Sequence, residues 1–136
     1  MKYVSFLFAV VLMAGSAFAN MDSVFRFHYS NSNAYYSCHY AEAQVSNTLA
    51  VLGAENIDTD CRGGIEHNQL FPVSVEAVYT QAAKGEREVV FQGNESCDFN
   101  VKLIKAALKN FDHEVVSSKT SCWDASGRYN IRVLVR

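Results

Sequence analysis

The sequence contains one proline, Pro72, and no low-complexity segment. Linkers between domains are usually rich in proline, glycine or serine, so a chain of several domains is not indicated. A Cys-x-x-Cys motif is also lacking, which removes the usual evidence for a thioredoxin-like redox site or a zinc knuckle. After residue 19, no stretch is long and apolar enough for a membrane-spanning helix. These absences favour one compact domain.

An excess of basic charge is lacking as well. The sequence has 12 Lys and Arg residues and 14 Asp and Glu residues. Removal of residues 1–19 would leave 11 basic and 14 acidic side chains on 117 residues, a formal net charge of −3. Such a chain has no general attraction to nucleic acid or to an anionic membrane. We therefore expect no nucleic-acid partner.

The first 19 residues have the pattern of a signal peptide. Lys2 supplies the positive charge, and the apolar run 6–14 is too short for a stable membrane anchor. The residues Ala17-Phe18-Ala19 fit the small-x-small cleavage rule, so the mature chain is expected to begin at Asn20. We predict export to the periplasm or the exterior, no membrane span after cleavage, and a monomer of residues 20–136.

An internal repeat organises the mature chain. The pairs Ser37-Cys38 and Ser96-Cys97 are 59 residues apart, and each precedes a stripe of apolar residues at helical spacing. At this offset the stripes align as Val45 with Ile104, Leu49 with Leu108, and Leu52 with Phe111. The pattern predicts helices over about 38–52 and 97–110. We expect Ser37 and Ser96 as N-caps and Gly53 as a left-handed C-cap.

Four cysteines in an exported chain indicate two disulfides in an oxidising compartment. Sequence alone leaves three pairings open. The pairing Cys38–Cys61 and Cys97–Cys122 treats both copies alike, without a bond between them. Each bond would then join a helix start to a strand end. Loops of this size contribute roughly 3 kcal/mol each by the chain-entropy model.

Alternating apolar residues predict three strands in each copy. The predicted strands cover residues 24–30, 56–61, 73–79, 87–92, 114–123 and 128–136, and Arg62–Leu70 is expected to be a connecting loop. The fold class is α+β: a tandem βαββ repeat with a mostly antiparallel sheet, two helices packed on one face, and a disulfide within each repeat. The halves are about 20–82 and 83–136. The halves form either one continuous sheet or two packed units. We favour one sheet, because a three-stranded half with one helix has little core of its own.

The loops at the cysteine end are the predicted recognition surface, since Tyr, Trp and Arg dominate binding hot spots. The candidate residues are Tyr35, Tyr36, His39, Tyr40, Arg62, His67 and Trp123. For each residue the alternative is packing: the tyrosines would pack against the helix start, and Trp123 would cover the neighbouring disulfide.

Catalytic and metal-binding patterns are weak. The cysteines are expected to be oxidised, no serine lies in a Gly-x-Ser-x-Gly elbow, and no ligand spacing suits a metal. We therefore assign no catalytic residue, cofactor or metal. The favoured hypothesis is a binding protein for a protein, peptide or glycan. The alternatives are an exported hydrolase-like enzyme with a site between the halves, and an envelope-associated structural protein that assembles through residues 128–136.

Overall fold

The computed structural model describes residues 22–31, 34–66, 69–82, 85–123 and 126–136. The predicted signal peptide and Asn20 lie outside these residues. Each half follows the predicted order of strand, helix, strand, strand. The elements are β1 (Asp22–Tyr29), α2 (Cys38–Leu52), β2 (Ala54–Glu66), β3 (Gln69–Gln81), β4 (Arg87–Gly93), α3 (Cys97–Leu108), β5 (His113–Trp123) and β6 (Ser126–Val135).

The strands form two antiparallel sheets of three strands, sheet A in the order β1-β3-β2 and sheet B in the order β4-β6-β5. The last strand of each half therefore lies between the other two. The expectation of one continuous sheet is wrong. The proposed assembly through residues 128–136 as an exposed edge is also wrong, because β4 and β5 occupy both sides of β6.

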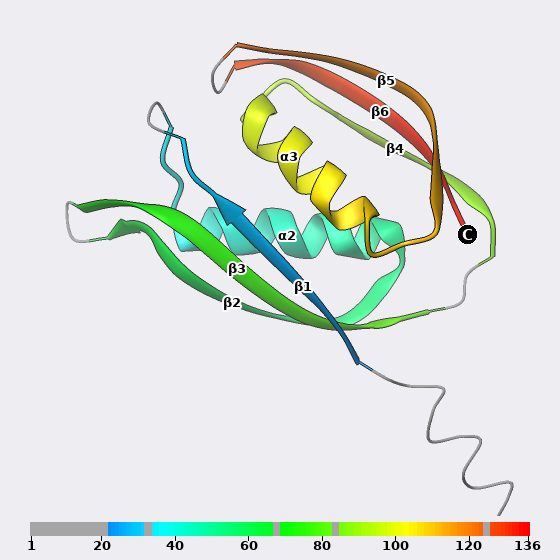
Figure 1. Cartoon of the computed structure of the whole chain (residues 1–136), viewed down its shortest axis with the longest axis horizontal. Coiled ribbons are helices and arrows are strands. Elements are labelled where there is room, and N and C mark those ends of the chain that lie inside the picture. Colours follow the sequence, from blue (N-terminus) through cyan, green and yellow to red (C-terminus); the bar gives the residue numbers. More distant parts are fainter. Residues whose placement is uncertain (1–21, 32–33, 67–68, 83–84, 124–125) are drawn as a thin grey trace, which may run out of the picture.

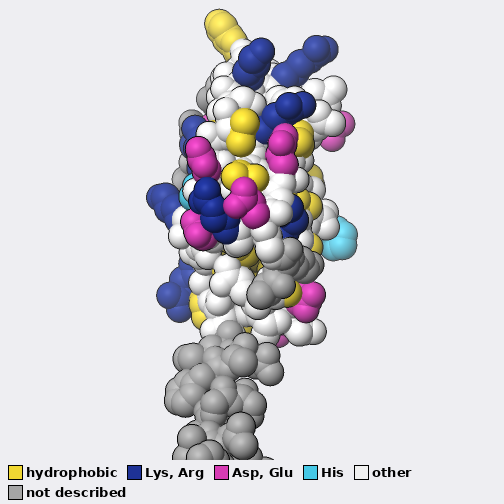
Figure 2. All heavy atoms as spheres, turned by 90° about the vertical axis from the view of Figure 1, so that its right-hand side faces the viewer, with side chains coloured by type: hydrophobic (Ala, Val, Ile, Leu, Met, Phe, Trp, Pro, Cys, Tyr) yellow, Lys and Arg dark blue, Asp and Glu magenta, His cyan; other side chains and the backbone are white. Residues whose placement is uncertain are grey.

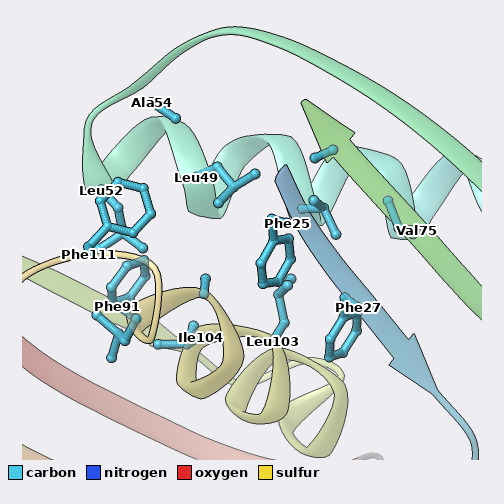
Figure 3. Packing of buried hydrophobic residues seen from close by; sticks show 14 of the residues in the cluster. Phe25, Phe27, Leu49, Leu52, Ala54, Val75, Phe91, Leu103, Ile104 and Phe111 are labelled. Carbon is cyan, nitrogen blue, oxygen red and sulfur yellow. The ribbon is translucent and has the colours of Figure 1, made fainter. Parts of the chain in front are cut away.

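The two helices lie between the two sheets (Figure 1). Their predicted stripes are buried: Val45, Leu49 and Leu52 on α2, and Ile104, Leu108 and Phe111 on and after α3. Side chains from both halves form one hydrophobic core, in which Phe25 and Phe27 of β1 meet Leu103 of α3 (Figure 3). A half with one helix does need more core than it has alone. It obtains that core from helix contacts across the halves rather than from sheet continuity.

Two of the three predicted helix caps are confirmed. The Ser37 hydroxyl accepts a hydrogen bond from the Tyr40 amide at 3.1 Å, and Gly53 adopts the left-handed conformation with φ of 110°. These N- and C-caps of α2 confirm the prediction. The prediction for Ser96 is wrong, because it has φ of 48° and its side chain makes no capping hydrogen bond. The start of α3 is instead stabilised by Asp98 in the first turn, whose negative charge interacts favourably with the positive end of the helix dipole.

Two hydrogen bonds tie the halves together in a reciprocal way. The Arg87 guanidinium at the start of β4 donates to the Val51 carbonyl near the end of α2 at 3.2 Å. The Asn110 amide just after α3 donates to the Val24 carbonyl near the start of β1, also at 3.2 Å. Val51 and Asn110 are 59 residues apart, the same offset as the helix-starting cysteines. Each helix end therefore meets the first strand of the other half.

None of the helices in the described ranges has both the length and the apolar character that crossing a membrane requires.

Candidate functional site

The two disulfides lie at the same end of the molecule. They join Cys38 to Cys61 and Cys97 to Cys122, which confirms the predicted pairing. Their Cα atoms are 5.6 and 5.4 Å apart, respectively. Figure 1 shows that both helices begin, and both long hairpins turn, on the same side of the molecule. The bonds themselves fit an oxidising compartment.

Aromatic rings pack the two helix starts against each other. The Tyr36 ring lies 4.6 Å from the Phe99 ring between centroids, and it stacks on Tyr40 at 5.2 Å. Tyr29 of β1 also contacts Phe99, at 5.0 Å. Tyr36 and Tyr40 pack against the hydrophobic core. For these two candidates the structure therefore supports the packing alternative over a recognition role.

The other predicted site residues that the structure describes face solvent. Trp123 is 79% exposed at the end of β5, so it does not cover the neighbouring disulfide. Tyr35 is 36% exposed in the segment before α2, and His39 and Arg62 are also exposed. His39 and Arg62 help to line an open hollow of about 590 Å³ beside the Cys38–Cys61 disulfide. His67 lies outside the described residues.

The hairpin of β2 and β3 carries three exposed apolar residues that sequence reasoning missed. Ile65 is 50% exposed, Leu70 is 54% exposed and Phe71 is 45% exposed. Ile65 and Leu70 are directly opposite each other across the hairpin. The segment Arg62–Leu70 was predicted to be a loop, but β2 continues to Glu66 and β3 begins at Gln69. The correction turns an expected loop into an apolar hairpin tip.

Two glycines explain the wrong loop prediction. Gly63 and Gly64 have φ of 82° and 78°, which gives the strand an irregular register between Gly63 and Ile65 without ending it. A Cβ atom on Gly64 would lie 2.7 Å from the Tyr36 carbonyl oxygen. The Ile65 amide donates to that same oxygen at 3.1 Å. The glycine therefore lets the hairpin dock on the segment that leads into α2. Apolar residues on both sides of a short polar turn were the available sequence signal.

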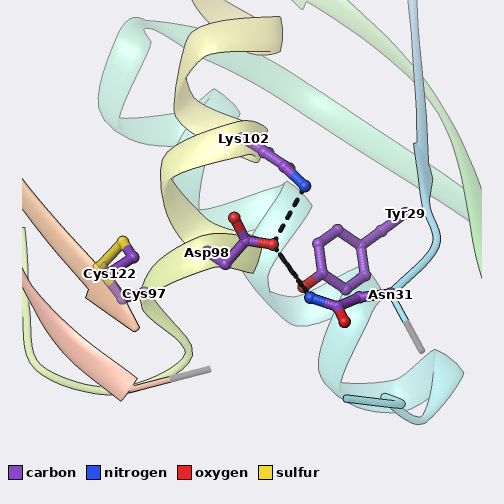
Figure 4. A network of polar contacts seen from close by, with 6 residues as sticks. All are labelled: Tyr29, Asn31, Cys97, Asp98, Lys102 and Cys122. Atoms are coloured by element: carbon purple, nitrogen blue, oxygen red, sulfur yellow. Dashed lines mark hydrogen bonds and ion pairs between the residues drawn. A yellow bond between two sulfur atoms is a disulfide. The ribbon is translucent and has the colours of Figure 1, made fainter. Parts of the chain in front are cut away.

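A polar network joins the halves beside this surface (Figure 4). The Tyr29 hydroxyl donates to Asp98 Oδ2 at 2.8 Å, and the Asn31 amide donates to the Tyr29 hydroxyl at 3.2 Å. Lys102 Nζ lies 3.1 Å from Asp98 Oδ2 and 5.4 Å from the centre of the Tyr29 ring. Asp98 and Lys102 form the i, i+4 pair expected on a helix.

Burial and hydrogen bonding shift the pKa values in this network. Burial, together with the hydrogen bond to Asp98, raises the pKa of Tyr29 far above its usual value. Burial alone would raise the pKa of Asp98, but hydrogen bonds from Tyr29 and Lys102 outweigh it and lower that pKa below 3.8. Burial also raises the pKa of Tyr36. At neutral pH the network therefore holds a carboxylate and a protonated phenol.

A shallow groove between the halves is the place where an enzyme site was considered. It has a volume of about 210 Å³ and lies between α2, α3 and β4. The described residues that line it are amides, a threonine, aliphatic and aromatic side chains, and Tyr129, whose pKa is raised by burial. No carboxylate, histidine or cysteine is among these lining residues. The groove therefore lacks converging acid and base groups.

The histidines are dispersed. His28 forms a hydrogen bond with Ser74 at 2.7 Å on the outer side of sheet A, and His113 with the Phe111 carbonyl at 2.8 Å. His39 is exposed at the start of α2. Within the described ranges, no three His, Cys, Asp or Glu residues are grouped so that they could hold a metal ion.

The end of the molecule opposite the hairpin tips has a different character. Figure 2 shows Lys and Arg side chains intermingled with Asp and Glu, with smaller hydrophobic areas between them and a hydrophobic side chain that projects at the top of the view. Arg136 lies 3.5 Å from Glu86, 3.7 Å from Asp112 and 3.4 Å from Glu114. Paired charges make this end a poor recognition surface.

Comparison with protein-family models, with curated proteins and with solved structures found no match.

Proposed function

We propose that the protein is a small exported binding protein that captures a partner protein at its disulfide end. The binding surface, which we call the apolar rim, consists of Tyr35, Ile65, Leu70, Phe71 and Trp123. The observation that carries this proposal is the exposure of Trp123, at 79%, together with the three apolar residues of the other hairpin tip. Isolated exposed apolar residues are common, but tryptophan with other large apolar side chains at one end of a molecule is typical of binding hot spots.

The supporting frame of the rim is rigid. The Cys38–Cys61 bond anchors the hairpin that carries Ile65, Leu70 and Phe71, and the Cys97–Cys122 bond anchors the residue before Trp123. Side chains held in place before binding lose less conformational entropy when they bind. The two disulfides therefore have a second use besides stability, which is to present the rim. The disulfides and the signal-peptide pattern together support export.

The test is capture of a partner from the native extracytoplasmic fraction by immobilised protein. Phe71→Ser and Trp123→Ser are expected to lose at least about tenfold in partner recovery, since each removes a hot-spot side chain. The matched control is Val24→Ser, because Val24 is 47% exposed on β1 but does not belong to the rim. All three variants should keep the unfolding temperature within a few degrees of the unaltered protein. Equal recovery by the rim variants and the control would refute the proposal.

A further inference from the structure

The outer face of sheet B carries an open polar hollow of about 830 Å³. Its orientation follows from the strand alternation: Ile131 and Val133 on β6 are buried against the helices, so the even-numbered residues of β6 point outward. Gln92, Asn130 and Lys119 lie opposite one another on β4, β6 and β5. Neighbouring strands are about 4.8 Å apart, so this row of side chains spans roughly 10 Å.

A second row extends the hollow toward the disulfide end. Arg128 on β6 lies opposite Ser121 on β5, and both residues line the same hollow. Lys119, Ser121, Arg128 and Asn130 are all exposed. The hollow thus presents two amides, a hydroxyl, an ammonium group and a guanidinium group across three strands. Its lining contains no carboxylate.

Within the described ranges, the two positive charges in the hollow have no carboxylate partner. Among the described residues, neither Lys119 nor Arg128 forms an ion pair. By contrast, Arg132, which follows Arg128 by four residues on the same face of β6, lies 3.9 Å from Glu88. Unpaired cations beside amides and hydroxyls, on a chain of formal net charge −2, make a local site for an anionic ligand.

The outer face of sheet A is an internal comparison. There the hollow has a volume of about 280 Å³, and its lining includes Asp60 and Glu76. Arg26 on the same face is already bonded to Glu76 at 2.9 Å. The described ion pairs also leave Arg62 of the sheet A hollow unpaired, but there it lies with two carboxylates in a smaller hollow. The sheet B hollow is wider and has two unpaired cations and no carboxylate in its lining. This difference between the two outer faces indicates a ligand that binds to the second half alone.

We propose that the outer face of sheet B binds an oligosaccharide that carries carboxylate groups. Amides and hydroxyls hydrogen-bond to sugar hydroxyls, and Lys119 and Arg128 form charge-assisted hydrogen bonds with the carboxylates. A row spanning roughly 10 Å is too broad for one inorganic anion. Two cations are too few for nucleic acid, whose affinity depends on many phosphate contacts. The site uses other residues than the apolar rim, although Trp123 lies on the same face of β5 two residues after Ser121, and it goes beyond the proposed function.

The test is an NMR titration of the isotope-labelled, disulfide-bonded protein with three probes: tetragalacturonate, neutral maltotetraose and sodium sulfate. Tetragalacturonate is expected to shift the amide signals of Lys119, Arg128 and Asn130, and the other two probes are expected to leave them unchanged at equal concentration. No shift with tetragalacturonate, shifts in another region, or equal effects of maltotetraose or sulfate would each overturn the proposal.

Variants distinguish specific binding at this site from general electrostatic attraction. Lys119→Gln and Arg128→Gln are each expected to weaken tetragalacturonate binding by about tenfold, because each removes a charge-assisted contact. Arg132→Gln removes the same charge from the same face of β6 outside the hollow, and it should change the Kd less than about twofold. An equal loss in Arg132→Gln would show nonspecific attraction and refute the site. Phe71→Ser, on β3 of the other half, should bind tetragalacturonate normally, so the rim and the saccharide site can fail independently.

Discussion

The Tyr29 hydroxyl donates a hydrogen bond of 2.8 Å to the Asp98 carboxylate and thereby joins the first strand of one half to the helix of the other. Hydrogen bonds to charged groups contribute about 2 kcal/mol. Asp98→Asn should therefore lower the free energy of unfolding by about 2 kcal/mol at pH 7. The measurement is urea unfolding. Lys102→Gln is the control: its side chain is 55% exposed, and its loss should cost less than about 0.5 kcal/mol.

The same carboxylate predicts a pH dependence. Because the pKa of Asp98 is lowered in the folded state, its stabilisation is complete above the unfolded value of 3.8 and is lost as the pH falls toward the folded value. The stability difference between the unaltered protein and Asp98→Asn should shrink below that pH. A difference that is constant from pH 7 to pH 3 would show that the charge of Asp98 has no part in it.

Removal of either disulfide should destabilise the protein to a similar extent. The bonds close segments of similar length, with sequence separations of 23 and 25 residues. The double variants Cys38→Ser/Cys61→Ser and Cys97→Ser/Cys122→Ser should each lose about 3 kcal/mol in urea unfolding. Peptide mapping of the unreduced protein checks the connectivity first, and a peptide linked from one half to the other would contradict it.

Gly64 should tolerate no side chain. Gly64→Ala would place a Cβ atom 2.7 Å from the Tyr36 carbonyl oxygen and 3.1 Å from the Cys38 amide nitrogen, at a positive φ of 78°. Gly85→Ala is the matched control, since Gly85 has φ of 72° but no atom within 4 Å of the added Cβ. Both variants bear the backbone strain of about 1 kcal/mol, and only Gly64→Ala bears the clash. Thermal unfolding should show a loss for Gly64→Ala at least twice that for Gly85→Ala.

The exposure of Trp123 can be read from its fluorescence, because the chain contains one tryptophan. At 79% exposure the folded protein should emit at nearly the wavelength of the urea-unfolded protein. Acrylamide should also quench the two states to a similar degree. A clear blue shift on folding would show that Trp123 packs against the disulfide region, which would remove the main observation behind the proposed function.

Local patterns predicted the helices and the covalent frame. The apolar stripe ending at Leu52, the cap at Gly53 and the spacing of the cysteines depend on neighbouring residues or on the repeat, and the structure confirms all three. The cap expected at Ser96 failed because its left-handed backbone turns the side chain away from the helix amides. The sequence shows that Ser96 is of a residue type that often caps helices. Its backbone conformation depends on the connection from β4 to α3, which is shorter than the connection from β1 to α2.

Features that depend on distant residues were not predictable from the pattern. The division into two sheets follows from how the helices share a core, and alternation along single strands contains no information about that choice. The site was predicted only in part: Trp123, Tyr35, His39 and Arg62 are exposed, whereas Tyr36 and Tyr40 pack around Phe99. Tyrosine suits an interior and a binding surface equally well, so its residue type alone does not distinguish them.

The reciprocal bonds from Arg87 to Val51 and from Asn110 to Val24 bear on the origin of the molecule. In both bonds the end of one helix meets the first strand of the other half, although the donor is on the strand in one and after the helix in the other. No strand is exchanged between the sheets. A shorter precursor could have met these contacts by associating with a second copy of itself about a two-fold axis. Fusion of its gene in tandem would then have converted a homodimer into one chain, freeing the outer face of each sheet to diverge.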